Sequence, residues 1–369
     1  MVLSDDPFLQ SIPAELTATA AELTGHGSTA LLRNSTAPLS FSPVLQPSMA
    51  VSAALDADFF SAFVWVVPTE QTPDQFDLAL FAEQLVEFGA IEPDEAATLT
   101  RRGNRFTGTI REIPFEVVLS SHLPEMAMPI VLHIDLSYFG PLYKNEITTP
   151  LFPTVLGQLT AIHQARWPVL TTTLSLSNLS GVVPLDSRFL RTVFSEVFAE
   201  PALLAGEAPL NWQRQKDIFY VENLFQYEKG LDLALAMTQT APDDAGAQFA
   251  LYKAQRQLRM SQEAFDSLDR AVALDPIYAG EYLRLAPLAN EKGRADEAAR
   301  MLRLAATALP DQPLIRLDLA YALLQTGEQD AALRILDDLI AGDWSPVYYP
   351  EMRTALREQR QAVKTAHAD

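Results

Sequence analysis

The stretch 264-AFDSLDRAVALDP-276 is followed 34 residues later by 298-AARMLRLAATALP-310. Both begin with alanine, carry leucine at the fifth position and alanine at the eighth, and end in proline. A third copy, 332-ALRILDDLIAGDW-344, keeps the first alanine and the leucine but ends in tryptophan. A fixed period of this length predicts a stack of helical hairpins, in which each repeat contacts its neighbours.

Each marker has a physical role in such a stack. The alanine lets two helices approach closely, the leucine fills the seam between them, and the proline ends the second helix. Gly293 and Gly327 fall in the expected turns, again 34 residues apart. We expect a degenerate helical pair before Pro242 and a final helix over about 350–365, because the ends of a stack need covers. The repeats themselves are predicted at 245–276, 279–310 and 313–344.

This helical half resembles the tetratricopeptide repeat family over about a third of the chain. The matching residues are Ala264, Leu268, Ala271 and Pro276; Gly293, Ala298, Leu302, Ala305 and Pro310; and Ala320, Gly327, Ala332 and Leu336. Two features depart from the family pattern. The large aromatic residue often found early in the first helix is missing, and Pro287 falls inside a first helix, where it should kink or shorten that helix.

The resemblance implies a concave surface, lined by the first helix of each repeat, that holds a peptide or a folded partner. At the groove-facing offsets of the motif stand Lys253, Arg256, Arg284, Asn290, Asp318 and Tyr321. Three of these side chains are cations, which can receive an acidic segment or a terminal carboxylate. The alternative is that they are ordinary solvated helix residues, paired with Glu and Asp at helical spacing.

Charge and composition exclude several classes of protein. The net charge is −20, with 9 basic and 22 acidic side chains in the first 205 residues, and there is no run of Lys or Arg. Nucleic acid and anionic membrane are therefore not expected partners. The absence of cysteine rules out disulfides, thiolate nucleophiles and cysteine-ligated metals. The start of the chain lacks a secretory pattern, and the most apolar early stretch, 50–68, contains Asp56 and Asp58, so we expect an acidic, cytoplasmic protein.

The first half alternates between strand and helix patterns. This order predicts a three-layer α/β domain with a mostly parallel sheet over 1–205, followed by an all-α repeat domain over 206–369. Asp74 is expected to cap the second helix, Gly89 to end it, and Phe76, Leu80, Leu85 and Phe88 to lie near one face. The predicted strands are 63–67, 106–110, 115–119, 129–136 and 169–177, and the predicted helices are 14–23, 74–88, 150–166 and 187–199.

The best chemical candidate is His133-Ile-Asp135, at the end of an apolar strand. Side chains two apart on a strand share a face, and ligands of open α/β sheets bind beyond the carboxyl ends of the strands. An imidazole and a carboxylate there could begin a site for a divalent metal such as Mn²⁺ or Zn²⁺. The alternative for Asp135 is structural, since a strand-end aspartate often caps the next loop or helix.

This region also resembles arginase-like ureohydrolase folds, in which a strand-end Asp-x-Asp holds part of a metal pair. The similar segments are 136-LSYF-139, 171-TTTLSLS-177 and 181-GVVPLD-186. His133 stands where the first acid of the pair would be, and 39-LSFSPVLQP-47, the expected counterpart of an earlier ligand strand, has no charged residue. A two-metal hydrolase needs several converging carboxylates, so the resemblance implies a catalytically degenerate domain without catalytic residues or cofactor.

No dinucleotide-binding, phosphate-loop, zinc-protease or serine-hydrolase motif is present. We therefore predict a non-catalytic adaptor or scaffold that binds a protein or peptide through its repeats. The alternative is a metal-dependent hydrolase of a C–N bond, with His133 and Asp135 as metal ligands.

Overall fold

The computed structural model describes residues 1–30, 32, 40–176 and 187–366. The chain forms two compact units, each made of two stretches of sequence. Residues 1–11 and 47–267 form the first, called the sheet unit here, and residues 12–46 and 268–369 form the second, called the repeat unit. Across the described parts of the chain, no helix combines the length and the apolar character needed to cross a membrane.

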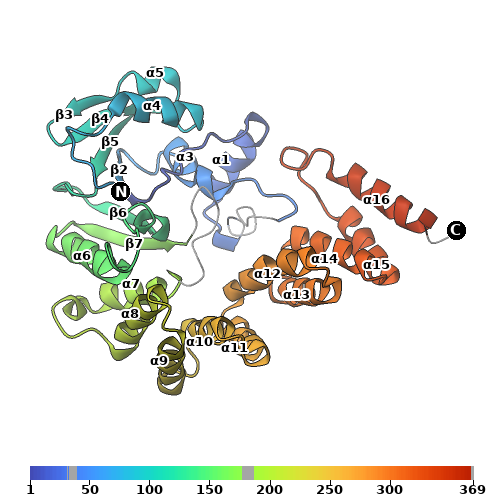
Figure 1. Cartoon of the computed structure of the whole chain (residues 1–369). Coiled ribbons are helices and arrows are strands. Elements are labelled where there is room, and N and C mark those ends of the chain that lie inside the picture. The colour runs from blue at the N-terminus through green and yellow to red at the C-terminus, as the bar shows by residue number, and fades with distance from the viewer. Residues whose placement is uncertain (31, 33–39, 177–186, 367–369) are drawn as a thin grey trace. The chain divides into compact units, whose positions relative to one another are not determined.

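The sheet unit contains a mixed seven-stranded sheet in the order β3-β4-β5-β2-β1-β6-β7 (Figure 1). Strands β5, β2, β1, β6 and β7 run parallel, and β4 and β3 add an antiparallel edge. The mostly parallel sheet is therefore confirmed, whereas an arginase-like fold stays a prediction. The strands are β1 Val2–Leu3, β2 Phe63–Val67, β3 Thr100–Arg102, β4 Arg105–Ile110, β5 Ile113–Leu119, β6 Ile130–Asp135 and β7 Val169–Ser175.

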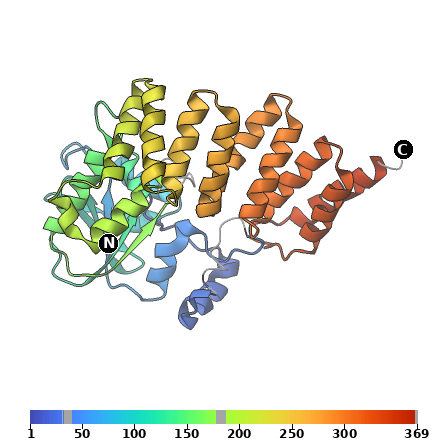
Figure 2. The same cartoon turned by 90° about the horizontal axis from the view of Figure 1, so that it is seen from below.

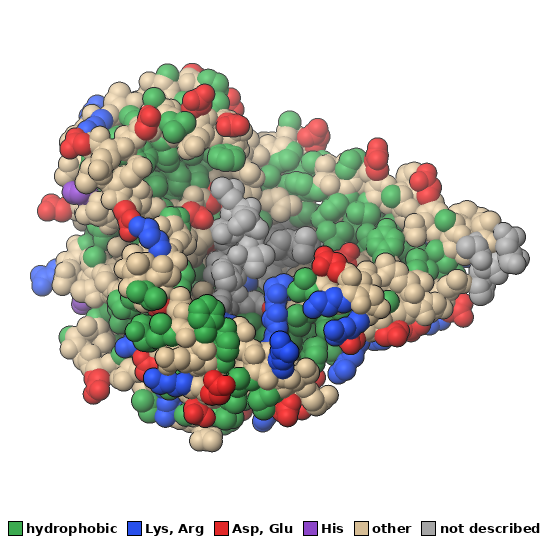
Figure 3. Space-filling model, viewed as in Figure 1, with side chains coloured by type: hydrophobic (Ala, Val, Ile, Leu, Met, Phe, Trp, Pro, Cys, Tyr) green, Lys and Arg blue, Asp and Glu red, His purple; other side chains and the backbone are tan. Residues whose placement is uncertain are grey.

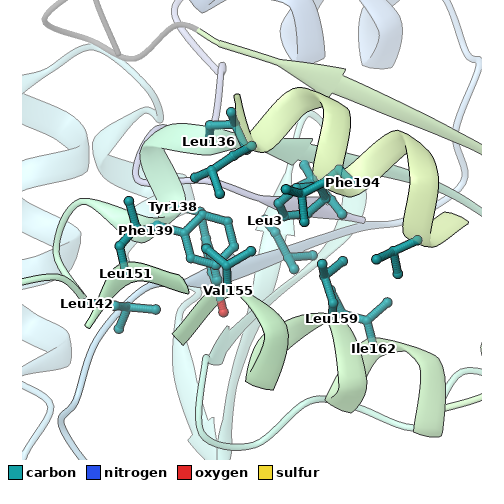
Figure 4. Close-up of a cluster of buried hydrophobic side chains, with 14 of the residues drawn as sticks. Leu3, Leu136, Tyr138, Phe139, Leu142, Leu151, Val155, Leu159, Ile162 and Phe194 are labelled. Atoms are coloured by element: carbon teal, nitrogen blue, oxygen red, sulfur yellow. The ribbon is translucent and has the colours of Figure 1, made fainter. Parts of the chain in front are cut away.

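Two hydrophobic cores lie on opposite faces of this sheet, because neighbouring residues of a strand point to opposite sides. Leu3 belongs to the core that includes Val155 of α6 (Leu151–Gln164) and Phe194 of α7 (Leu190–Ala199), as Figure 4 shows. Val2 belongs to the other core, with Leu85 of α4 (Leu78–Glu87). Shorter elements of this unit are η2 Pro47–Met49, α3 Ala50–Asp56, α5 Pro93–Ala96, η3 Leu136–Phe139 and η5 Pro201–Leu204.

Helix α4 begins later than the sequence pattern predicts. Asp77 caps it by accepting a hydrogen bond from the Leu80 amide at 3.0 Å, whereas Asp74 pairs with Arg101 at 2.7 Å. The predicted Asp74 cap is therefore wrong. Of the four apolar residues expected near one face, Leu85 is buried, whereas Leu80 and Phe88 are exposed. Gly89 ends the helix as expected, with φ of 66°.

Four helices continue the sheet unit after residue 205: α8 (Leu210–Asn223), α9 (Tyr227–Thr240), α10 (Ala245–Gln257) and the start of α11 (Ser261–Leu274). Helix α8 packs on the sheet helices, with the Trp212 ring 5.9 Å from that of Phe152 and the Phe219 ring 5.6 Å from that of Phe189. A boundary between separately folding domains near residue 205 stays a prediction.

The repeat unit holds the remaining helical hairpins, in which successive helices lie side by side (Figure 2). Ala298 and Ala305 on one helix, and Ala332 and Leu336 on another, are buried as the period predicts. Helix α12 runs through Pro287 with 12 residues, against 13 in α14. The elements are η1 Ala14–Leu16, α1 Thr17–His26, η6 Pro276–Ala279, α12 Gly280–Glu291, α13 Ala295–Ala308, α14 Pro313–Gln325, α15 Gln329–Ala341 and α16 Met352–Ala366.

The turn inside each hairpin shows how far the period extends. Phe225, Arg259, Gly293 and Gly327 all have positive φ, between 58° and 81°, and each stands 34 residues after the previous one. The αL conformation at these positions reverses the chain between two helices. The turn of the helical pair before Pro242 therefore follows the same 34-residue spacing as the others, whereas its role as a cover for the stack stays a prediction.

Candidate functional site

Two of the predicted groove residues lie on α10 in the sheet unit. The Lys253 ammonium is 3.1 Å from a Glu222 carboxylate oxygen and 5.7 Å from the centre of the Phe219 ring, and its side chain is 22% exposed. Arg256 is exposed and donates to the Tyr252 hydroxyl at 3.2 Å. Lys253 is thus held by a carboxylate of α8, so an incoming anion would have to compete with Glu222.

The other four predicted residues lie in the repeat unit. Arg284 of α12 donates two hydrogen bonds, of 2.7 and 2.5 Å, to the buried Glu281 carboxylate one turn earlier. This is the helical pairing that the alternative interpretation of these cations expects. Asn290, Asp318 and Tyr321 are exposed, and partial burial raises the pKa of Asp318. Whether these six side chains bind a partner stays a proposal.

A second cluster lies where three parallel strands end in the sheet unit. Asp5 follows β1, Asp135 ends β6, and Ser175 ends β7. The Ser137 amide donates to the fully buried Asp135 carboxylate at 2.8 Å, while the Ser137 hydroxyl donates to Asp5. The Ser175 hydroxyl donates to the other oxygen of Asp135. Asp135 therefore caps the following turn, as its structural interpretation predicts.

Asp5 and Asp6 were not predicted from the sequence. Strand β1 has only two residues, too few to show a strand pattern, and the sequence instead favours 39–47 as the earlier ligand strand. Leu39 lies outside the described residues, and 40–46 form no strand, so that placement is wrong. The available signal was Val2 and Leu3 directly before Ser-Asp-Asp, since an apolar pair followed by carboxylates is typical of a strand end.

Burial governs the charge of this cluster. It raises the pKa of Asp5, and it raises the pKa of Asp6 to about 6, although the Phe8 amide that donates to Asp6 at 2.8 Å acts in the opposite direction. The negative charges of Asp5 and Asp135 raise the pKa of Asp6 further. Carboxylates that share one buried site resist ionising together.

His133 lies beside the carboxylates, as the spacing in the strand predicts. Its Nε2 is 3.1 Å from the Ser175 hydroxyl and its Nδ1 is 2.8 Å from the Thr173 hydroxyl. Burial lowers the pKa of His133, and the Asp135 charge opposes that effect without reversing it. Burial therefore favours the neutral form of the ring, which meets the Phe8 ring edge to face at 5.4 Å.

His133, Thr173 and Ser175 line a cavity of about 320 Å³ in the sheet unit. The other lining residues are mostly apolar: Met1, Val2, Phe8, Pro47, Ala50, Val51, Ala54, Phe60, Ala62, Phe63 and Val131. Among the described residues, no group of three or more His, Asp or Glu side chains is arranged to hold a metal ion. The predicted 171-TTTLSL-176 forms β7 and the residue after it, whereas Ser177 and 181–186 lie outside the described residues.

Comparison with known proteins addresses the helical part. Residues 289–343, from the end of α12 to just beyond α15, match the family model for the tetratricopeptide repeat. Residues 289–343 therefore carry the tetratricopeptide repeat pattern. The match includes the turn residues Gly293 and Gly327. It also includes the buried Ala298, which follows the first turn, and the buried Ala332, which follows the second.

Individual relatives share only part of this chain. Cellulose synthase 2 operon protein C of Komagataeibacter xylinus is 37% identical over 107 residues, which is 28% of this chain and 8% of that protein. Two solved structures of MamA align with TM-scores of 0.28 and 0.27 at 16% identity. They cover 43% and 42% of this chain, and the alignments span 94% and 87% of the MamA chains.

Proposed function

We propose that this protein is a non-catalytic adaptor that binds a protein or peptide partner through its tetratricopeptide repeats. The observation that supports the proposal is the 34-residue recurrence of turns at residues 225, 259, 293 and 327 together with the family match over 289–343. Stacked hairpins of this kind create extended concave surfaces, which repeat proteins use for binding. The cytoplasm is the proposed compartment, and neither nucleic acid nor membrane is a proposed partner.

The proposed contact residues are Lys253 and Arg256 on α10, Arg284 and Asn290 on α12, and Asp318 and Tyr321 on α14. Arginine suits the recognition of a carboxylate because its planar guanidinium can form two parallel hydrogen bonds. Acidic side chains are scattered over the face shown in Figure 3, and several Lys and Arg side chains gather near its middle. An acidic segment of a partner is therefore the proposed ligand.

The test begins with co-purification from the native source and identification of the stoichiometric partner by mass spectrometry. The double variant Arg256→Ala/Arg284→Ala should then weaken binding by roughly tenfold or more, as the loss of charged hydrogen bonds predicts. Arg102→Ala/Arg105→Ala, on the β3–β4 hairpin, is the matched control and should bind normally. Unchanged affinity of the repeat variant, with its helical circular dichroism intact, would remove these arginines from the interface.

The alternative function is hydrolysis of a C–N bond by a divalent metal held near Asp135. One observation favours it, namely that Asp5 and Asp135 converge on Ser137. Titration calorimetry with Mn²⁺ and Zn²⁺ tests this alternative directly. Heat of binding that disappears in Asp135→Asn would support it, and a blank titration of the natural protein would end it.

A further inference from the structure

The last repeat ends differently from the others. Where the period would place a fourth proline after Pro242, Pro276 and Pro310, the chain has Trp344. Its side chain is 4% exposed, and its indole N–H donates to the Leu339 carbonyl at 2.7 Å. The Tyr349 ring lies 5.2 Å from the indole. Trp344, with the Tyr349 ring beside it, thus stands where a proline ends the earlier repeats.

Residues 40–45, from the N-terminal part of the chain, pack against the Trp344 ring and the loop around it within the repeat unit. The Phe41 ring meets the Trp344 ring edge to face at 4.9 Å. The Ser345 amide donates to the Phe41 carbonyl at 2.8 Å, and the Tyr348 hydroxyl donates to the Val44 carbonyl at 3.3 Å. Backbone and ring contacts therefore hold residues 40–45 in one register on the loop 342–349.

Gly342 makes room for the phenylalanine. A Cβ added there would lie 2.6 Å from Cδ1 and 2.8 Å from Cζ of the Phe41 ring. The backbone of Gly342, with φ of −64° and ψ of 153°, is one that any residue adopts. The absence of a side chain at residue 342 is thus required by the Phe41 ring and not by the conformation of the loop.

We propose that loop 342–349 is a binding slot for an extended segment anchored by a phenylalanine, and that residues 40–45 of the same chain occupy it as a clasp. Pro43 and Leu45 are buried, which is unusual for a segment without helix or strand. The clasp lies on the loop that follows α15 and precedes α16 in the chain. Because the clasp is part of the same chain, its effective concentration at the slot is high. A partner segment could replace it only by binding the slot tightly enough to compete with that concentration.

Gly342→Ala separates this proposal from a general loss of stability, because alanine fits the backbone and only expels the Phe41 ring. Hydrogen exchange read by mass spectrometry should show the amides of 342–349 exchanging roughly tenfold faster or more in Gly342→Ala and in Phe41→Ala. The double variant should exchange no faster than either single variant, since residues in contact do not act additively. Exchange in the sheet strand β6 should not change.

Two substitutions serve as controls in the full-length protein. Ser42→Ala alters an exposed neighbour of Phe41, and Gly157→Ala adds a methyl group where nothing lies within 4 Å. Neither should change the exchange of 342–349. If Phe41→Ala and Gly342→Ala both leave that exchange at its natural rate, or if their effects add in the double variant, the clasp does not form and the proposal is overturned.

Discussion

The sheet and the helical repeats bring their elements together in opposite ways. In the sheet, Val2 pairs with Trp65 on one side and with His133 on the other, so the central strand depends on residues far along the chain. In the repeats, the helices from α12 to α16 each pack on the next one, and the same small and apolar residues recur every 34 positions. Local contacts leave a period in the sequence, whereas distant contacts leave none.

The largest expected effect comes from truncating one buried leucine in the sheet and one in the repeats. Leu132 of β6 and Leu336 of α15 are both fully buried, so Leu132→Ala and Leu336→Ala should each cost about 2–5 kcal/mol of stability. The loss from Leu336→Ala should stay among the repeats, because a stacked repeat contacts only its neighbours. Urea denaturation combined with native-state hydrogen exchange measures both effects. If the β6 amides lost protection from hydrogen exchange equally in the two variants, the contrast between the sheet and the repeats would be wrong.

The next test uses the buried carboxylate after β1. The pKa of Asp6 is raised to about 6 in the folded protein, so the native state binds a proton more tightly than the unfolded chain does. The stabilisation is present below about pH 4 and is lost as the pH rises through 6. Asp6→Asn keeps an oxygen that accepts from the Phe8 amide but carries no group that must ionise at this buried position. The variant should therefore be more stable than the natural protein by about 1–3 kcal/mol at pH 7.

Thermal denaturation between pH 4 and pH 8 measures this difference. The advantage of Asp6→Asn should shrink as the pH falls below 6 and should vanish near pH 4. Asp77→Asn, at the exposed cap of α4, is the control. A constant difference between Asp6→Asn and the natural protein at all pH values would show that the Asp6 carboxyl does not titrate in this window.

A smaller effect is expected at the repeat turns, where two glycines and two larger residues adopt the same conformation. Gly293→Ala places a Cβ at φ of 72° and should cost about 1 kcal/mol. Arg259→Gly relieves the same strain at φ of 60° and should stabilise by up to about 1 kcal/mol. Opposite shifts in the urea midpoint are the expected result. Shifts of the same sign would show that Arg259 stabilises its turn by other contacts.

The smallest effect is expected from an ion pair on the repeat surface. Arg303 and Glu328 approach within 3.0 Å with both side chains about half exposed. Such pairs contribute about 0–1 kcal/mol because water and salt screen them. A double-mutant cycle with Arg303→Ala and Glu328→Ala, measured at low and at 0.5 M salt, should give a coupling below about 1 kcal/mol that falls with salt. A larger, salt-independent coupling would contradict this expectation.

Sequence reasoning succeeded where one local feature was decisive. Strand β2 lies at the predicted 63–67, and the hairpin of β4 and β5 forms where two apolar runs flank a short turn. It failed where a distant partner decided the outcome. The local sequence does not show whether Asp74 or Asp77 caps the helix. The structure decides it, because Asp74 forms an ion pair with Arg101 from another element. The groove residues on α10, α12 and α14 stay predictions, because their function depends on a partner that the sequence does not contain.

The amino-acid sequence by itself determined the repeats, since a helical hairpin is stabilised by its own apolar seam and by a neighbour with the same small and apolar marker residues. It also determined the apolar strands of the sheet, because covered strands need continuous hydrophobic side chains. Only the tertiary structure made Val2 and Leu3 a central strand, brought Asp5 beside Asp135, and placed Phe41 on Trp344. The physical reason is that such contacts join segments with no shared pattern, and they exist only once the chain between them has folded.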